Sequence, residues 1–433
     1  MSMLICGGHL IDPAAGKDGI FDILVKDGVV AELAEWKNGE APVWKDGVAE
    51  VVIDATGKYV MPGFIDLHVH LREPGLEYKE TIATGAMAAA AGGFTSVCPM
   101  PNTKPSTDTP EKIRAILEKA KTDAKIHILP IGAISIGQEG KVLADIKGMA
   151  AAGAVAFSED GKSVMNSALY AEGLKEAAKA GVPVFAHCED IDLVRGGVMN
   201  AGKRADELGL PGITNAVEDI ITARDIFLAR ETGVRLHLCH CSTKDSVKMI
   251  ALAKAEGLPV SGETGPHYFT MIDEEIPRDW GNYKMNPPLR GKEDKEALIL
   301  ALQDNVLEAI ATDHAPHSKE EKEQSMLKAP FGIVGSETAY ALTVTELVRT
   351  GKLTMTQLVE RMSASPAKIL GINKGSLKVG MAADITIADA KTPWTIEPEK
   401  FYSKGKNTPF AGKEVYGKIY YTIADGKIAF EQK

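Results

Sequence analysis

The feature that most constrains the fold is an alternation, from residue 63 to about 312, of short apolar runs with longer helix-type stretches. Eight apolar runs occur, from GFIDLHVH to VLEAIATD, and several of the intervening stretches end in glycine, as helices do. Strands that alternate with helices form parallel βαβ units, so eight of them predict a closed (β/α)₈ TIM-like barrel of the α/β class. An open doubly wound sheet is disfavoured by this count and by the lack of a glycine-rich dinucleotide loop.

The two ends of the chain follow a different pattern. FDILVKDGVVAELAE, near the N-terminus, and GKIYYTIADGKIAFEQ, near the C-terminus, each place two β-type runs around a short turn. Neither end alone has enough strands to form a stable hydrophobic core. We therefore predict two domains, a β-sandwich built jointly from residues 1–60 and 375–433 and a catalytic barrel over residues 61–374.

Composition narrows the class of function. With 45% hydrophobic and 25% charged residues the chain is typical of globular proteins, and its net charge of −10 argues against binding nucleic acid or an anionic membrane. Its five cysteines are scattered and odd in number, and we find no signal peptide and no apolar run of bilayer length. We expect a cytoplasmic protein with reduced thiols and a small-molecule substrate.

The first apolar run carries polar side chains at alternate positions. Alternate residues of a strand point to the same face, so these side chains share one face while the strand lasts. A lone histidine near a strand end is usually structural, but two on one face of an otherwise apolar strand favour metal binding. We therefore predict that the face formed by residues 66, 68 and 70 looks toward metal. The alternating residues are Asp66, His68, His70 and Arg72.

Other histidines and aspartates occur where later strands of the predicted barrel end. Active sites of such barrels lie at the C-terminal ends of the strands. Neutral imidazole and carboxylate oxygen are ligands of zinc and similar divalent ions, and two metals ~3.5–4 Å apart can share such a set. The sequence therefore predicts a metal centre there. The candidate ligands are His68, His70, Asp160, His187, His240 and Asp313.

The motif HLCHC requires a choice between two histidines. His237 and His240 have opposite parity, so in a regular strand only one faces the barrel axis. We choose His240, which is nearer the C-terminal end. Cys239 and Cys241 then point away and are expected to be small core residues. The histidines that we do not place in the site are His9, His127 and His267.

The motifs together resemble one enzyme family. DLHVHLREPG, MPNTKP, FSEDG, HCED, HLCHCST, KMNPPLR, ATDHAPHS and PFGIVGSET are similar to those of dihydroorotases, specifically the long bacterial type in the amidohydrolase superfamily. The resemblance spans essentially the whole chain. It implies interconversion of N-carbamoyl-L-aspartate and L-dihydroorotate, the ring-closing step of pyrimidine biosynthesis, on a metal-dependent barrel with a terminal β-sandwich.

The resemblance also implies roles for the ligands. His68 and His70 would bind the more buried metal together with Asp313, and His187 and His240 would bind the second metal. A metal lowers the pKa of bound water to ~7 and polarises an amide carbonyl. We expect Asp313 to take the proton of the attacking water and deliver it to the departing ring nitrogen, as ligand and general acid/base.

Asp160 occupies the position where many amidohydrolases carry a carboxylated lysine. The resemblance implies Zn²⁺, two ions per chain, with Asp160 as the bridge between them. Lys162 lies two residues further on and is expected to be a loop lysine. A single metal, with Asp160 outside the bridging role, stays open as the alternative.

The substrate carboxylate needs a positively charged partner. Arg72, just past the metal histidines, offers a bidentate fork. The resemblance implies that Asn102 and His317 complete this clamp and that Asn286 faces the pyrimidine ring. His314 is expected behind the ligands.

A glycine-bearing loop, residues 329–337, is predicted to close over the substrate through backbone groups, with Phe331 and Gly332 as its contact residues. We further expect a homodimer, with aspartate transcarbamoylase as a candidate protein partner.

Three other functions compete with this reading. Hydantoinases and allantoinases share the motif HxH, but Asp160 replaces their lysine and Arg72 suits a substrate carboxylate. A non-catalytic dihydroorotase-like subunit that serves as a scaffold for aspartate transcarbamoylase should have lost ligands, and here every expected position is filled. A nucleobase deaminase is disfavoured by the substrate-clamp motifs.

Overall fold

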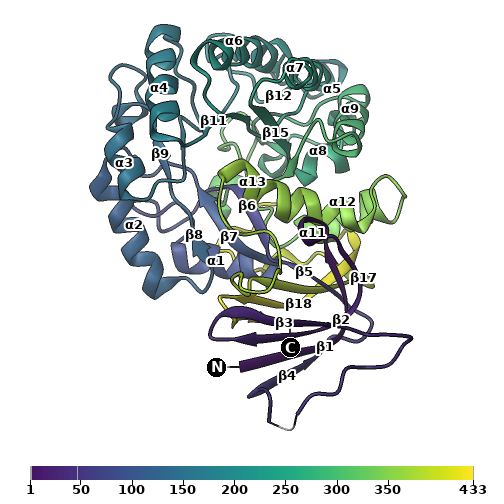
Figure 1. The fold of residues 1–433 in the computed structure, drawn as a ribbon. Helices are drawn as coiled ribbons and strands as arrows, with labels where there is room; N and C mark the ends of the chain where they lie inside the picture. The colour runs from purple at the N-terminus through teal and green to yellow at the C-terminus, as the bar shows by residue number, and fades with distance from the viewer. Residues whose placement is uncertain (1, 46, 433) are drawn as a thin grey trace.

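The computed structural model describes residues 2–45 and 47–432 and contains the predicted barrel (Figure 1). Each of the eight apolar runs lies in strands that pair in parallel with their neighbours, and a parallel bridge between Val69 and His314 joins the first run to the last. The third run is divided into two short strands. The barrel strands are β6 (Phe64–Val69), β7 (Phe94–Pro99), β8 (His127–Ile128), β9 (Ile131–Ala133), β10 (Ala156–Ser158), β11 (Val184–Ala186), β14 (Leu236–Leu238), β15 (Val260–Thr264) and β16 (Ala309–Ile310).

Helices connect the strands and surround the barrel (Figure 1). Two of the predicted glycine ends are present, because Gly181 and Gly233 follow helices with φ values of 74° and 70°, the left-handed conformation favoured at helix C-termini. None of the described helices is long and apolar enough to cross a bilayer. The helices are α1 (Ile82–Ala91), α2 (Pro110–Asp123), α3 (Ile146–Ala152), α4 (Ser167–Ala180), α5 (Lys203–Leu208), α6 (Ala216–Thr232), α7 (Lys244–Ala255), α8 (Pro266–Thr270), α9 (Lys292–Gln303), α10 (Lys319–Lys322), α11 (Ala339–Thr343), α12 (Met355–Val359) and α13 (Ser365–Leu370).

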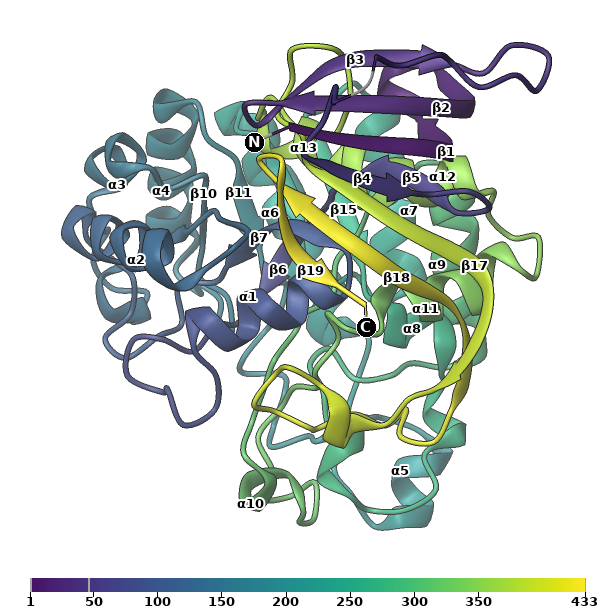
Figure 2. The same cartoon turned by 90° about the horizontal axis from the view of Figure 1, so that it is seen from below.

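Strands from both ends of the chain form one eight-stranded sheet beside the barrel (Figure 2). Two hairpins turn at Asp27-Gly28 and Asp425-Gly426, where all four residues have positive φ, as tight hairpin turns require. Pairing is antiparallel except where β1 meets β4 and β5 in parallel. The joint terminal β-structure is thus confirmed, whereas the boundaries at residues 60 and 375 remain a proposal. The strands are β1 (Ser2–Asp12), β2 (Lys17–Lys26), β3 (Val29–Glu35), β4 (Val51–Asp54), β5 (Tyr59–Pro62), β17 (Ile385–Thr395), β18 (Glu414–Ala424) and β19 (Lys427–Glu431).

A buried carboxylate joins this sheet to the barrel. Asp384, one residue before β17, lies 2.6 Å from Lys374 Nζ and 3.1 Å from Nε2 of His127, and it accepts the N–H of Asp425. Burial would raise the pKa of Asp384, but the hydrogen bond and charge of His127 and the charge of Lys374 bring it to about 2. His127 is therefore structural in this arrangement.

We expect Asp384→Asn to lower the free energy of unfolding by about 2 kcal/mol at pH 7, because the folded-state pKa lies below that of an unfolded carboxyl. This contribution is present above pH ~4 and is lost as the pH falls toward 2. Urea unfolding at pH 7 and pH 3 measures it. Asp425→Asn is the matched control, because that side chain is 60% exposed and should change stability by less than about 0.5 kcal/mol. Equal losses in both variants would contradict the role of Asp384.

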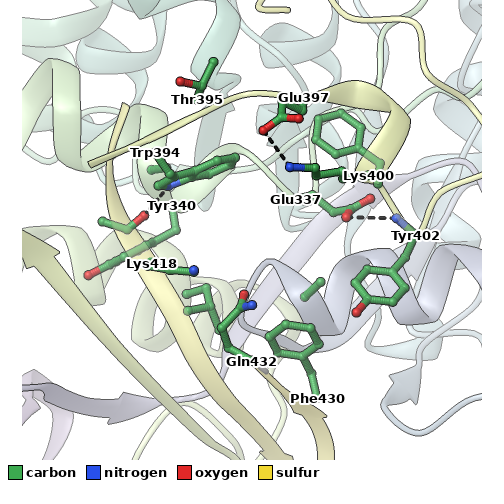
Figure 3. A pocket seen from close by; sticks show the side chains of 15 residues that line it. Glu337, Tyr340, Trp394, Thr395, Glu397, Lys400, Tyr402, Lys418, Phe430 and Gln432 are labelled. Carbon is green, nitrogen blue, oxygen red and sulfur yellow. Dashed lines mark hydrogen bonds and ion pairs between the residues drawn. The ribbon is translucent and has the colours of Figure 1, made fainter. Parts of the chain in front are cut away.

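A cavity of about 380 Å³ lies where α11 meets β17, β18 and β19 (Figure 3). Trp394 lines it, and its polar groups pair with one another, since Lys400 contacts Glu397 at 2.8 Å and Glu337 accepts the N–H of Tyr402. Of the predicted site, this cavity is lined by Glu337 alone, the last residue of the loop 329–337, and by none of the predicted ligands or substrate contacts.

Candidate metal centre and active site

The structure brings the six predicted ligands together at the C-terminal ends of the barrel strands. Each ligand lies in the last part of a strand or within a few residues after it, and each is no more than 7% exposed. The ligands and their strands are His68 and His70 (β6), Asp160 (β10), His187 (β11), His240 (β14) and Asp313 (β16).

Asp160 lies at the centre of this cluster. Its Oδ1 is 3.1 Å from Nε2 of His68, 3.3 Å from Nδ1 of His187 and 3.7 Å from Nε2 of His240. Its Oδ2 is 3.5 Å from Nε2 of His70. One carboxylate therefore contacts all four histidines, which is the placement that a bridging ligand needs.

Two overlapping ligand groups share His68. In one, the donor atoms of His68, His70 and Asp313 lie within 4.8 Å of one another, with Oδ1 of Asp313 3.0 Å from Nε2 of His70. In the other, His68 groups with Asp160 and His240. Nε2 of His240 is also 2.8 Å from Nδ1 of His187. The cluster thus offers two sets of nitrogen and oxygen donors around one shared histidine.

The residues present fit divalent cations. Both ring nitrogens of His68 are fully buried and lack a hydrogen-bond partner of normal geometry. Leaving buried polar atoms unpaired costs free energy, so these nitrogens are suited to binding a cation. Burial lowers the pKa of His68, but Asp160 outweighs it and raises the pKa well above its usual value. A site whose carboxylates favour a proton on this ring also favours a bound cation.

Asp313 is held in its ionised form. Burial would raise its pKa, but the hydrogen bond with His70 and the charges of His68, His70 and His240 bring it to about 2. An ionised carboxylate both binds metal and accepts a proton. Asp313 can therefore serve in both predicted roles.

Backbone conformation places several site residues. Three site residues have positive φ values, a backbone conformation that residues other than glycine seldom adopt. They are Arg72 (62°), His240 (35°) and Asp313 (48°). Such conformations cluster at functional sites. Here they turn the chain immediately after the strands.

This turn explains why strand parity failed at the motif HLCHC. β14 ends two residues before His240, so alternation no longer applies there. Nε2 of His237 lies 3.0 Å from Oε2 of Glu263, and Glu263 in turn contacts His68. The sulfur of Cys239 also lies within 4.8 Å of the donor atoms of His68 and Glu263. The prediction that only one of the two histidines is directed to the site, with Cys239 pointing away, is wrong.

Glu263 is a functional candidate that the sequence reasoning missed. It is fully buried, and its Oε1 lies 3.3 Å from Nδ1 of His68. Burial would raise its pKa, but the hydrogen bond with His237 and the charges of His237 and His68 bring it to about 2. A carboxylate behind a metal-binding histidine fixes the ring orientation. The available signal was an acidic residue near the end of the seventh apolar run, LPVSGET.

Asp66 does not share the face of His68 and His70 toward the ligand cluster, contrary to the prediction for residues 66, 68 and 70. Its carboxylate accepts the N–H and hydroxyl of Thr312, at 3.0 and 2.6 Å, and the N–H of His68. Register shifts on either side of Asp66 interrupt the regular strand. Asp66 instead ties β6 to the residue before Asp313.

The predicted substrate residues fall into two groups. Nη2 of Arg72 is 3.2 Å from Nε2 of His317, and burial lowers the Arg72 pKa only to about 10, so it stays charged at neutral pH. Asn102 contacts ligands, since its Oδ1 lies 2.9 Å from Nδ1 of His70 and its Nδ2 3.4 Å from Oδ2 of Asp160. Arg72 and His317 therefore form a pair, and Asn102 lies against the metal cluster.

Asn286 reaches the cluster through an acidic residue. Its Nδ2 donates to Oε1 of Glu189 at 2.7 Å, and Oε2 of Glu189 is 3.3 Å from Nε2 of His187. Glu189, in the motif HCED, was not among the predicted site residues. Glu189 can hold the His187 ring as Glu263 holds that of His68.

Two residues near the ligands lie behind or outside the cluster. His314 contacts Glu80 at 3.4 Å, and its carbonyl accepts the N–H of His70. Lys162 donates to the carbonyl of Gln138.

The loop of residues 329–337 already contacts the site residues. The Phe331 carbonyl lies 2.8 Å from Nε2 of His317, and the Gly332 N–H donates to the carbonyl of Lys284. The loop therefore lies against His317 and Lys284.

Known proteins match this chain along its whole length. A family model described as Dihydro-orotase-like matches residues 57–246. The dihydroorotase of Acetivibrio thermocellus is 47% identical, covering 100% of this chain and 99% of that protein. The dihydroorotase of Geobacter metallireducens is 47% identical with 100% of both chains covered, and that of Staphylococcus epidermidis is 49% identical over 88% of this chain and 90% of the relative.

Solved structures of cyclic amidases share the fold. The L-hydantoinase (dihydropyrimidinase) from Arthrobacter aurescens has a TM-score of 0.86 and 28% identity, covering 99% of this chain and 96% of that one. The D-hydantoinase (dihydropyrimidinase) from Thermus sp. has a TM-score of 0.83 and 28% identity, covering 99% and 95%. These similarities confirm the predicted barrel with a terminal β-sandwich.

The fold and the buried histidine–carboxylate cluster define an enzyme of the cyclic amidohydrolase class. Relatives 47–49% identical over nearly all of its length show that the chain belongs to the dihydroorotase family. The resemblance predicted from its motifs is confirmed.

Proposed function

We propose that this chain is a zinc-dependent dihydroorotase that interconverts N-carbamoyl-L-aspartate and L-dihydroorotate in pyrimidine biosynthesis. The observation that carries the proposal is the buried Arg72–His317 pair beside the ligand cluster, because it provides a site for a substrate carboxylate. Hydantoin itself carries no carboxylate for this pair to bind. Comparing hydrolysis of dihydroorotate with that of hydantoin tests the proposal, and faster turnover of hydantoin would overturn it.

We propose two Zn²⁺ ions per chain, bridged by Asp160. The nitrogen and oxygen donor set suits zinc, and the contacts of Asp160 with all four histidines support a bridge. His68, His70 and Asp313 would hold one ion, and His187 and His240 the other. When bound, such ions lower the pKa of water and polarise the amide carbonyl.

The protein residues supply proton transfer. In the hydrolytic direction, Asp313 accepts the proton of the attacking water and delivers it to the ring nitrogen as that nitrogen departs. In the biosynthetic direction the same carboxylate takes the proton from the carbamoyl nitrogen as the ring closes and delivers it to the carboxyl oxygen, which leaves as water. Its hydrogen bond with His70 keeps Oδ1 within the cluster during both steps.

The clamp residues orient the substrate. Arg72 and His317 would bind its α-carboxylate with Asn102, and Asn286 would face the ring. Asn102 is hydrogen-bonded to ligands, so substrate binding requires it to share or exchange these bonds.

Phe331 and Gly332 would cover the substrate with their backbone. The Gly332 N–H donates to Lys284, so that amide must exchange its partner before it can reach substrate.

We expect Arg72→Lys to raise KM for carbamoyl aspartate about tenfold with little change in metal content, because a point charge replaces a bidentate fork. Steady-state kinetics and elemental analysis measure this. Arg114→Lys, at an exposed side chain on α2, is the control and should leave KM unchanged. An unchanged KM in Arg72→Lys would remove Arg72 from the clamp.

We also propose, from the family resemblance alone, a homodimer that can associate with aspartate transcarbamoylase. Sedimentation of the purified chain, with and without that enzyme, tests both statements. A monomer that sediments unchanged in the mixture would contradict them.

A further inference from the structure

Helix α10 ends in a buried lysine. Lys322 is 1% exposed, and no carboxylate in residues 2–45 and 47–432 forms an ion pair with it. Its Nζ donates to three carbonyls, those of Lys284 at 3.0 Å, Pro330 at 2.9 Å and Gly332 at 2.7 Å. An ammonium has three N–H donors, so these three acceptors use all of them.

Two of these acceptors flank Phe331 in the loop of residues 329–337, which we propose covers the substrate. The Phe331 carbonyl contacts His317, and its ring lies 4.4 Å from Nζ of Lys284. The third acceptor, the Lys284 carbonyl, also accepts the Gly332 N–H. Lys322 thus joins the segment 330–332 to Lys284 on one side and, through Phe331, to His317 on the other.

The orientation of this segment determines what it offers a ligand. The C=O and N–H of a trans peptide point in opposite directions, so a Pro330 carbonyl held by Lys322 turns the Phe331 N–H away from Lys322. That N–H has no hydrogen-bond partner among the described residues. It belongs to the residue whose carbonyl contacts His317, and an unpaired donor there is suited to an anionic substrate.

We propose that Lys322 is a positioning residue for substrate binding, whose ammonium fixes the backbone of residues 330–332 and thereby orients the Phe331 N–H and His317. This inference rests on the proposed function and assigns a role to a residue that does not itself touch substrate.

The experiment replaces Lys322 with methionine, which is unbranched and one atom shorter and removes all three donors. We expect KM for dihydroorotate to rise at least about tenfold, with a much smaller change in kcat. Hydrogen exchange of the Gly332 N–H, which donates to the Lys284 carbonyl, should accelerate at least about tenfold while the barrel strands exchange as in the parent. Lys322→Arg should not restore KM, because a larger planar group cannot reproduce the three contacts. Lys319→Met, on the same helix with its side chain 70% exposed, is the matched control.

Two results would overturn the inference. One is an unchanged KM with unchanged exchange of the Gly332 N–H in Lys322→Met. The other is faster exchange throughout the barrel with an unchanged KM, which indicates a purely structural lysine. If Lys322→Met does not fold, KM and hydrogen exchange are measured on Lys322→Arg instead, and the same two results would overturn the inference. A parent enzyme that does not hydrolyse dihydroorotate would instead refute the proposed function, and the exchange data would still report whether Lys322 holds the loop.

Discussion

Replacing Asp313 with asparagine should lower kcat for dihydroorotate hydrolysis by at least about 10³-fold. Asparagine keeps the size of the side chain and an oxygen that can face His70, but it cannot take a proton from water or deliver one to the ring nitrogen. Asp313 lies 3.0 Å from His70, and its pKa of about 2 keeps it ionised as a base at neutral pH. Steady-state kinetics measure the loss, and circular dichroism checks that the barrel is intact.

The control for this variant is Asp304→Asn, at an exposed position directly after α9, which should leave kcat unchanged. Metal content of Asp313→Asn should stay near that of the parent, because the histidine ligands are untouched. A kcat within tenfold of the parent, with metal bound, would contradict the acid/base role.

Replacing Asp160 with alanine should reduce bound metal from about two ions per chain to one or fewer and lower kcat at least about 100-fold. The reason is that this carboxylate contacts all four histidines, so its loss removes a ligand from both proposed ions and a negative charge from the centre of the cluster. Elemental analysis of the purified variant measures the metal, and hydrolysis of dihydroorotate measures the activity.

The neighbouring carboxylate provides a matched control for Asp160→Ala. Glu159 is also buried, but it accepts hydrogen bonds from Ser135 and from the N–H of Ile134. Glu159→Gln should therefore retain the metal, whatever its effect on stability. Metal content in Asp160→Ala equal to that of the parent would show that Asp160 is not a bridge.

The sequence predicted the barrel well because its signals are local. Each βαβ unit carries an apolar run and a helix-type stretch within about 40 residues, and glycine ends such as Gly181 and Gly233 act on their own helices. The hairpin turns Asp27-Gly28 and Asp425-Gly426 are local in the same sense. Such features need no knowledge of distant contacts.

The finer arrangement of the site depends on contacts that sequence spacing does not show. Asp66 binds Thr312, 246 positions away, and this pairing decides that Asp66 supports the site and is not a ligand. At His240 the left-handed backbone ended the alternation on which the parity argument rested. Glu263 showed no pattern of its own, because its role depends on His68 in a distant strand.

The most direct test of the central claim measures zinc and activity on the same freshly purified sample. Elemental analysis gives the metal content, and ultraviolet absorbance follows dihydroorotate hydrolysis, with hydantoin as the comparison substrate. We predict about two zinc ions per chain, turnover of dihydroorotate and none of hydantoin. Full metal content with no turnover of dihydroorotate would contradict the account, and turnover of hydantoin in that sample would assign the chain a hydantoinase activity instead.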